Sequence, residues 1–284
     1  MLGGVIVGTA SVAACALFPS LDGLSGDGGT SGDAGIDVTT NDAMADAPAD
    51  SMFDAAETTT TDAGASFSCA NSDAAFCDDF DDSDASTFAK WPKTITFGGG
   101  TVTRIASDAS SPFAVEFSVP GSDGGVVQAN LQHAFISGPT TFARYAFDLR
   151  VVKYPTVGSF NIAPVALTGS TTTGAVDAIA LKATTAPNFV EQIETDAGSS
   201  TVPHALSLKP VQGAWTHVRI EWTIAGSTIT AHVYFGTTDV SGAVVLDPSS
   251  AFTSTPEITA GVSFEAASTN GAIIDVDNVT FEMK

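Results

Sequence analysis

The sequence has 284 residues, and its 32 Asp and Glu against 10 Lys and Arg give a net charge of −22 at pH 7. A chain this acidic would be repelled by phosphate backbones, which argues against nucleic acid as a partner. The charge is uneven, because Lys90 is the first Lys or Arg and 16 of the acids precede it. Such asymmetry predicts a solvated acidic segment followed by an ordinary folded domain.

Residues 1–15 form a short apolar run that ends in Val12-Ala13-Ala14-Cys15. The run is too short to span a bilayer as a helix, and it is typical of the apolar part of a secretory signal peptide. Its last four residues resemble the bacterial lipobox, in which the cysteine is lipidated and becomes the mature N-terminus. The resemblance implies that a lipid on Cys15 is the sole membrane attachment. By analogy with lipoprotein sorting, Ala16 after the cysteine indicates the outer membrane or cell surface.

One feature departs from ordinary signal peptides, since no Lys or Arg precedes the apolar run. An unprocessed or disordered apolar end is the alternative interpretation. Residues 16–68 follow as a linker rich in Asp, Gly, Ala, Thr and Ser, with few large apolar residues and no periodicity. Such a segment buries too little apolar surface to offset its ordering entropy, so we expect a disordered acidic tether.

Two cysteines stand where the folded part begins. If Cys15 takes lipid, Cys69 and Cys77 remain, separated by seven residues. In an oxidising compartment they are expected to form a disulfide. A zinc site is the competing interpretation, but two cysteines without nearby histidines supply too few ligands.

From Cys69 to Lys284 the sequence predicts short strands and no amphipathic helix. In Gly213–Ile224, apolar Val218, Ile220 and Trp222 alternate with polar residues, and a short turn leads to a second alternating run, which is typical of a hairpin. Gly, Pro, Ser and Asp clusters separate the runs about every ten residues. The predicted strands are Ala75–Asp82, Thr94–Phe97, Thr101–Ala106, Phe113–Val119, Gly125–Gln132, Thr141–Val152, Ser159–Leu167, Val176–Ala183, Phe189–Thr195, Trp215–Ile224, Thr228–Phe235, Gly242–Leu246, Ile258–Ala266 and Ile273–Met283.

This pattern predicts an all-β fold, a single two-sheet antiparallel jelly-roll sandwich over residues 69–284. The stretch Gly213–Trp222 with the strand after it resembles the core of concanavalin A-like lectin and glucanase domains, particularly laminin-G-like modules. Phe76–Asp81 resembles their opening strand, and Ile274–Phe281 resembles their closing strand. The resemblance implies neighbouring first and last strands and a sheet that meets glycans, but no particular activity.

Glucanases of this fold carry Glu-x-Asp-x-x-Glu, because a retaining mechanism needs two carboxylates about 5–5.5 Å apart. The nearest match begins at Glu194 and has Ser199 at the last position, so the acid/base residue is absent. Glu191 and Glu194 are then expected to be solvent-facing strand residues. This absence argues against catalysis, and a glycan hydrolase or lyase stays as an alternative.

The four histidines are candidates for binding because imidazole hydrogen-bonds near neutral pH. His217 and His232 lie at polar positions of the two hairpin strands and are expected to be cross-strand neighbours, with Arg219 and Tyr234 on the same surface. We predict a sugar-binding patch of His217, Arg219, His232 and Tyr234, with a solvated outer face as the alternative. Trp215 and Trp222 are expected in the core, while the sequence does not place Trp91.

A structural Ca²⁺ is a further hypothesis. Asp79 and Asp81 lie on the opening strand, and Asp275 and Asp277 lie two residues apart on the closing strand, so each pair projects from one face. If the two strands are adjacent, carboxylates from both could supply the hard oxygen ligands that Ca²⁺ requires. The alternative is that these carboxylates simply face water.

Together these observations predict a surface-anchored, non-catalytic lipoprotein that binds a polysaccharide or cell-surface glycan. A structural or interaction lipoprotein without a glycan ligand is the first alternative. A glycan hydrolase or lyase is the second.

Overall fold

The computed structural model describes residues 69, 72–81, 88–106, 112–121, 125–135, 140–168, 174–182, 185–195, 198–247, 256–265 and 270–284. The predicted signal peptide with Cys15 and the predicted linker lie outside the described residues. Within the described ranges, no helix is both long and apolar enough to cross a bilayer.

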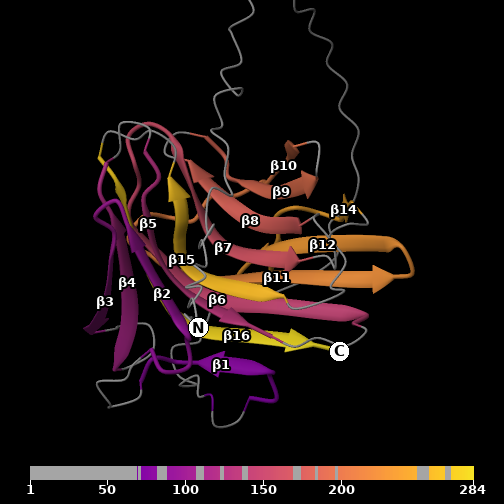
Figure 1. Ribbon diagram of the computed structural model, residues 1–284, viewed down its shortest axis with the longest axis horizontal. Coiled ribbons are helices and arrows are strands. Elements are labelled where there is room, and N and C mark those ends of the chain that lie inside the picture. Colours follow the sequence, from indigo (N-terminus) through magenta and orange to yellow (C-terminus); the bar gives the residue numbers. More distant parts are fainter. Residues whose placement is uncertain are drawn as a thin grey trace, which may run out of the picture. The chain divides into compact units, whose positions relative to one another are not determined.

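The described residues form two antiparallel sheets, as predicted (Figure 1). The nine-stranded sheet has the order β13 (Thr238–Asp239), β12 (Thr228–Phe235), β11 (Trp215–Ala225), β6 (Phe142–Lys153), β16 (Ala272–Met283), β4 (Phe113–Val119) and β3 (Thr101–Ala106), with β1 (Phe76–Asp78) on β16 and β14 (Val244–Leu246) on β12. The seven-stranded sheet has the order β10 (Gly198–Ala205), β9 (Asn188–Thr195), β8 (Gly174–Lys182), β7 (Ser159–Thr168), β15 (Glu257–Glu265), β5 (Gln128–Ala134) and β2 (Lys93–Phe97).

Alternation along the strands builds the core between these sheets. In β11, Val218, Ile220 and Trp222 are fully buried, whereas the residues between them reach the outer face. Phe160, Ile162 and other residues of the seven-stranded sheet belong to the same buried cluster. Because each sheet has one apolar face, burying both faces against each other is the main source of stability.

All fourteen predicted strands have a counterpart in the structure, and β10 and the two-residue β13 were missed. In β10, Pro203 has no backbone N–H to donate, and most of the side chains described in this strand are exposed. The strand is tolerated because it pairs only with β9, at the edge of its sheet. An edge strand buries little, so it carries no apolar alternation that a sequence pattern could reveal.

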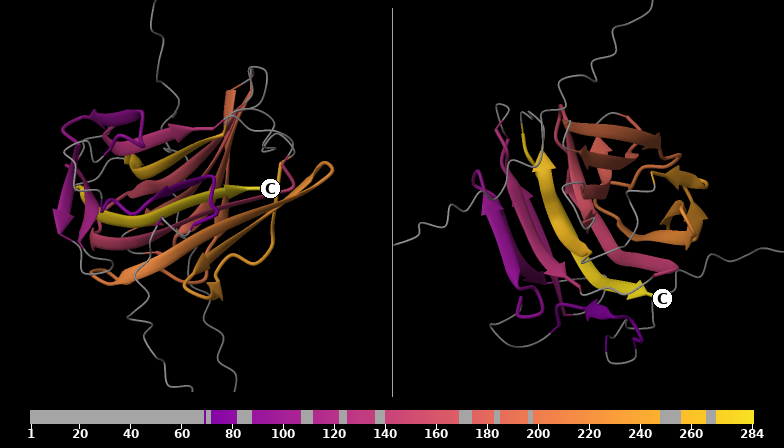
Figure 2. Two further views of the ribbon diagram at one scale, coloured as in Figure 1. Left: turned by 90° about the horizontal axis from the view of Figure 1, so that it is seen from below. Right: turned by 45° about the vertical axis from the view of Figure 1, so that its right-hand side comes forward.

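The first and last strands are neighbours, as the resemblance to concanavalin A-like domains implied. Phe76 of β1 lies opposite Phe281 of β16, and Figure 2 shows β16 as the long yellow strand beside β6. The predicted disulfide is also confirmed, since Cys69 and Cys77 are bonded with a Cα–Cα distance of 5.5 Å. It ties the chain before β1 to the nine-stranded sheet.

A bulge in β16 shapes the outer face of this sheet. The register between β16 and β6 shifts between Asp277 and Thr280, and Asn278 has φ of 52°. Asparagine adopts this left-handed conformation more readily than most residues. The bulge brings Asn278 toward β6, where its side chain meets Asp148.

Candidate functional site

The outer face of the nine-stranded sheet carries a dense group of polar and aromatic side chains, which we call the polar face. It extends over four adjacent strands, β12, β11, β6 and β16. All four predicted ligand-binding residues lie on it. Its members are Trp215, His217, Arg219 and Glu221 of β11, His232 and Tyr234 of β12, Arg144, Asp148 and Arg150 of β6, and Asp275, Asp277, Asn278 and Glu282 of β16.

Opposite charges alternate across the strands. Glu221 lies opposite Arg144, which in turn lies opposite Glu282 of β16. The Arg144 guanidinium is 2.9 Å from the Glu221 carboxylate and 3.6 Å from that of Glu282. Arg219 is 3.3 Å from the same Glu221. Cross-strand pairs of opposite charge favour one arrangement of these long side chains over others.

His217 is the exposed member of the polar face, and it belongs to a cluster with the partly buried Asp148 and the buried Asn278. His217 Nδ1 lies 2.8 Å from Asp148 Oδ1, and Asn278 Nδ2 donates to Asp148 Oδ2 over 2.7 Å. The His217 side chain is 48 % exposed. Asp148 therefore holds the imidazole in one orientation at the surface. It contacts Nδ1 of the ring and leaves Nε2 on the other side.

Trp215 lies on the polar face and not in the core, so that part of the prediction was wrong. It shares the parity of His217 and is partly exposed, and the Arg150 guanidinium lies 4.8 Å from its ring centroid. Arg150 also donates to Asp275 over 2.7 Å, which fixes the guanidinium beside the indole. Trp222 is fully buried, as expected.

Tyr234 and His232 occupy the β12 side of the polar face. Arg219 lies 4.1 Å from the Tyr234 ring centroid, and the rings of His232 and Tyr234 stack at 6.2 Å. His232 Nδ1 is 2.8 Å from Asp239. Partial burial acts to raise the pKa of Asp239. The net effect is a lowered pKa, because the carboxylate bonds to His232 and accepts from the backbone N–H groups of Gly242 and Ser241.

The two histidines are not cross-strand neighbours, contrary to the prediction. The register places His232 opposite Glu221 and Tyr234 opposite Arg219, and His217 pairs instead with Asp148 of β6. Alternation with apolar residues puts Arg144, Asp148 and Arg150 on the polar side of β6. It did not reveal that this strand lies between β11 and β16, which is what brings them to the histidines.

The four aspartates of the calcium hypothesis have separate roles. Asp79 accepts a hydrogen bond from the Cys69 N–H, Asp81 accepts one from the Phe113 N–H, and Asp275 pairs with Arg150. Asp277 accepts from the N–H of Asn278. Among the described residues, no three His, Cys, Asp or Glu side chains are grouped so as to hold a metal ion. The calcium site therefore stays a prediction without a cluster of ligands to support it.

Trp91, which the sequence did not place, is a buried core residue. Its indole Nε1 donates to Asp78 Oδ2 over 2.6 Å, and Lys90 lies 3.2 Å from the same carboxyl group. Burial raises the pKa of Asp78, and Lys90 and Trp91 oppose this shift. The opening strand is thus held by a buried polar contact.

Glu191 was expected to face solvent, and the structure places it inside the sandwich. It has the same parity in β9 as the core residue Phe189, and its carboxylate accepts from the Asp247 N–H over 2.7 Å. Directly opposite on β8 lies Asp177, which is also buried. The sequence could have indicated this position, because Glu191 is two residues from the apolar Phe189 and therefore projects from the same face of the strand.

No protein-family model matches the sequence, and no curated protein matches it. Solved structures that are similar include the alginate lyase vAL-1 from Chlorella virus, at 10 % identity and a TM-score of 0.49 over 69 % of this chain and 94 % of that one. Cellulose induced protein Cip1 has 16 % identity and a TM-score of 0.45 over 72 % and 96 %. The CBM2 module of the evolved Dit of Lactobacillus casei BL23 phage J-1 has 10 % and 0.46 over 73 % and 94 %. At these TM-scores and identities, the similarities carry no conclusion about function.

Proposed function

We propose that the protein is a non-catalytic glycan-binding lipoprotein that holds uncharged sugar units on its polar face. The observation that carries the proposal is the position of Trp215 on the same face of β11 as His217. A partly exposed indole backed by Arg150 lies two residues along the strand from an exposed imidazole that Asp148 fixes. Sugar recognition requires this combination of a ring for the C–H face and polar groups for the hydroxyls.

The ion pairs of the polar face support binding because they orient its side chains before a ligand arrives. Arg150 is held by Asp275, and Arg144 is held by Glu221. Ordering a long side chain on binding costs about 0.5–1.5 kcal/mol, and side chains that are already held avoid part of this cost.

Charge balance favours uncharged sugars. The polar face carries three arginines, Arg144, Arg150 and Arg219, against the five carboxylates of Asp148, Glu221, Asp275, Asp277 and Glu282. An acidic glycan would bring further negative charge to a surface where carboxylates already outnumber guanidinium groups. Like charges at an interface disfavour the wrong partner, so neutral polysaccharides are the expected class.

A hydrolase or lyase is the second candidate, and one observation favours it. His217 is exposed and oriented by Asp148, which is the arrangement of a general base. Against it, the arginines that would stabilise a developing negative charge are engaged with carboxylates of the polar face. The assay for binding should therefore also follow the release of sugar ends.

The proposal is tested on the full chain with Cys15→Ser, applied to an array of neutral and acidic polysaccharides. We expect retention on at least one neutral polysaccharide and little on acidic ones. Trp215→Ala and His217→Ala should each weaken binding about tenfold or more, whereas Thr223→Ala, exposed farther along β11, is the matched control. Retention that is equal in all variants would remove the polar face as the site, and release of sugar ends that His217→Ala abolishes would show catalysis.

The predicted anchor belongs to the same proposal and is tested separately. Lipid on Cys15 contributes about 0.8 kcal/mol per buried CH₂, and two or more chains hold a protein stably on a membrane. Cys15→Ser should therefore move the protein from the membrane fraction to the soluble fraction. Unchanged membrane association would make the lipobox interpretation wrong.

A further inference from the structure

The polar face contains the same arrangement of side chains twice. In each copy an aromatic residue and a histidine lie two positions apart on one strand and therefore project from the same face. The two pairs are Trp215 with His217 on β11, which we call the first site, and Tyr234 with His232 on β12, which we call the second site. The further contacts of the two sites also correspond.

An arginine of the neighbouring strand lies directly opposite the aromatic residue of each site. Trp215 pairs in register with Arg150, and Tyr234 pairs with Arg219. The guanidinium carbon lies 4.8 Å from the ring centroid in the first site and 4.1 Å in the second. Both distances are within the limit of about 6 Å for cation–π contacts, so each ring is held by the arginine opposite it.

A carboxylate orients the histidine of each site. His217 Nδ1 is 2.8 Å from Asp148, and His232 Nδ1 is 2.8 Å from Asp239. Because the carboxylate contacts the same ring nitrogen in both sites, Nε2 of each imidazole lies on the side away from it. Asp239 is itself held in place, since it accepts hydrogen bonds from two backbone N–H groups. The second histidine is therefore oriented before any ligand arrives, like the first.

The second site is accessible from solvent. The side chain of His232 is 31 % exposed, and Tyr234 is partly exposed as well. A sugar that reaches this site meets a phenol ring for its C–H groups and an oriented imidazole for a hydroxyl group. These are the same two elements that the first site offers.

One sugar unit cannot occupy both sites, because they are too far apart. His232 lies opposite Glu221, which is four residues from His217 on β11. With about 3.4 Å per residue and about 4.8 Å between strands, the Cα atoms of the two histidines are about 14 Å apart. Arg219, whose side chain is 31 % exposed, lies between His217 and Glu221 on the same strand. A ligand that contacts both sites must therefore be a chain of linked units that passes over Arg219.

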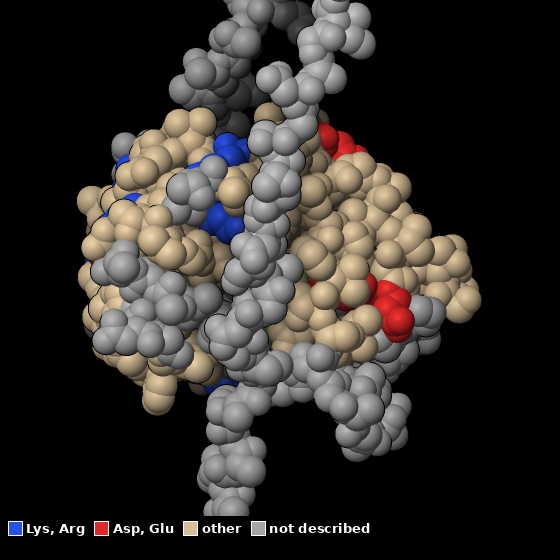
Figure 3. All heavy atoms as spheres, turned by 90° about the horizontal axis from the view of Figure 1, so that it is seen from above, with Lys and Arg blue, Asp and Glu red and all other residues tan. Residues whose placement is uncertain are grey.

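We propose that the polar face binds a linear neutral polysaccharide, with different sugar units at the first and second sites and Arg219 beneath the units between them. This inference rests on the proposed function, to which it adds a second site and a minimum chain length. On the face drawn in Figure 3, most of the described surface is uncharged, and the cations and carboxylates form small separate groups. The described surface drawn there has no continuous charged track for an acidic polymer, which agrees with a neutral chain.

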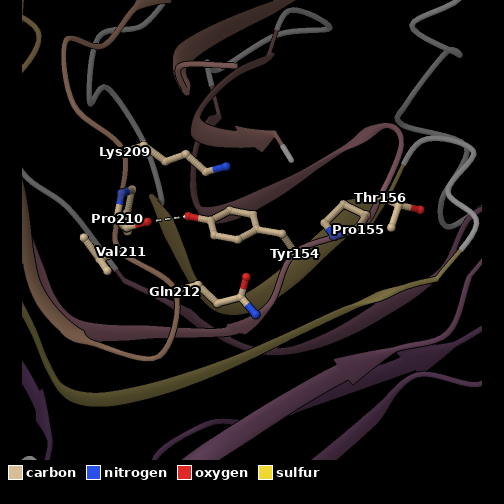
Figure 4. A pocket seen from close by; sticks show the side chains of 7 residues that line it. All are labelled: Tyr154, Pro155, Thr156, Lys209, Pro210, Val211 and Gln212. Atoms are coloured by element: carbon tan, nitrogen blue, oxygen red, sulfur yellow. Dashed lines mark hydrogen bonds between the residues drawn. The ribbon is translucent and has the colours of Figure 1, made fainter. Parts of the chain in front are cut away.

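A groove between the segment after β6 and the segment before β11 is a competing location for a sugar. Its lining residues include Tyr154, Pro210 and Val211, and its volume is about 560 Å³ (Figure 4). This volume lies within the range of small-ligand sites, about 300–1,000 Å³. None of its lining residues is a histidine or an acid, so the groove lacks the oriented imidazole that the first and second sites share. Val211 is 68 % exposed, and its replacement tests the groove directly.

The test is a calorimetric titration of the full chain with Cys15→Ser. The probes are oligosaccharides of cellulose, laminarin and mannan, from the disaccharide to the octasaccharide. For at least one series we expect Kd to fall about tenfold or more with chain length and then to level off. The second contact is made within the same complex once the chain reaches both sites, so it strengthens binding without a second association step. A tenfold change corresponds to about 1.4 kcal/mol.

Variants locate the second site. Tyr234→Ala and His232→Ala should each weaken octasaccharide binding about tenfold, whereas the disaccharide, which the first site still binds, should change by no more than about twofold. Tyr234→Phe keeps the ring and should retain most of the affinity. Thr223→Ala on β11 and Val211→Ala in the groove are the controls, and both should leave Kd unchanged. Melting curves of each variant establish that it is folded.

The outcomes separate this inference from the proposed function. If the disaccharide and the octasaccharide bind equally well and His217→Ala weakens both, the proposed function stands and the second site is wrong. Unchanged octasaccharide binding by folded Tyr234→Ala and His232→Ala variants would also overturn the second site, as would an equal loss in Val211→Ala. No binding by any oligosaccharide or array polysaccharide would overturn both.

Discussion

Asp177 and Glu191 face each other across β8 and β9 inside the sandwich, where Asp177 is 0 % and Glu191 is 2 % exposed. Trp222 of the opposite sheet donates its indole N–H to Asp177 Oδ2 over 2.8 Å. Burial, with the Glu191 charge adding to it, raises the pKa of Asp177 from 3.8 to about 8, although the Trp222 hydrogen bond opposes the shift. A protonated Asp177 avoids placing two like charges next to each other in the core.

This pair should make the unfolding free energy depend on pH. Because the pKa of Asp177 is higher in the folded state, its stabilising contribution is complete below about pH 4 and is lost as pH rises through 8. One proton corresponds to about 1.4 kcal/mol per pH unit between these limits. Urea unfolding of wild type and Asp177→Asn at several pH values measures the difference, which should be smallest below about pH 4, grow in favour of the variant as pH rises to about 8, and stay constant above that.

A control for this measurement is Glu282→Gln, which removes a carboxylate from the polar face outside the core. Its difference from wild type should vary much less with pH over the same interval. If the unfolding free energies of wild type and Asp177→Asn change with pH in parallel, the pKa of Asp177 is the same in the folded and unfolded states. That result would contradict the raised pKa of Asp177 beside Glu191.

Trp222→Phe tests the hydrogen bond that joins the two sheets. Phenylalanine keeps most of the buried ring but leaves Asp177 without the indole donor. A buried polar group that loses its partner costs about 1–3 kcal/mol, so the variant should unfold at correspondingly lower urea concentration. Combining it with Asp177→Asn should recover part of the loss. Additive effects of the two substitutions would contradict a direct contact.

The Cys69–Cys77 disulfide closes a short loop, since its cysteines are eight positions apart. A loop of this length constrains the unfolded chain by about 2–3 kcal/mol. The double variant Cys69→Ala, Cys77→Ala should melt at a lower temperature than the oxidised protein. Adding a reductant to the wild type should reproduce the effect, whereas the variant should not respond to it.

The calcium hypothesis is tested by melting curves in millimolar Ca²⁺ and in EDTA. An ion that binds only the folded state would add about 2.7 kcal/mol at a hundredfold excess over its Kd. If Asp79, Asp81, Asp275 and Asp277 hold it, the shift should disappear when Asp79 and Asp81 are replaced by Asn. Coincident curves in Ca²⁺ and EDTA would remove the site.

Local patterns were enough for much of the fold. Alternation in β11 correctly assigned Val218, Ile220 and Trp222 to the core and His217 and Arg219 to the outer face. The same rule, applied strictly, would have placed Trp215 outside and Glu191 inside, because parity decides the face whatever the side chain. Trp215 was wrongly assigned to the core because it is apolar, and Glu191 was wrongly assigned to the surface because it is charged. In both cases the position along the strand was the better guide.

The candidate site depends on which strands become neighbours. The sequence by itself determined the strands, their two faces, the acidic charge and the cysteine pair, because each depends on residues close together in the chain. Tertiary structure alone decided that β6 lies between β11 and β16, so that Asp148 meets His217 and Asn278. It also decided that Tyr154 donates to the Pro210 carbonyl, which joins the segment after β6 to the segment between β10 and β11. Such contacts join residues more than fifty positions apart, and register between distant strands is set by packing of the whole core and not by any local pattern.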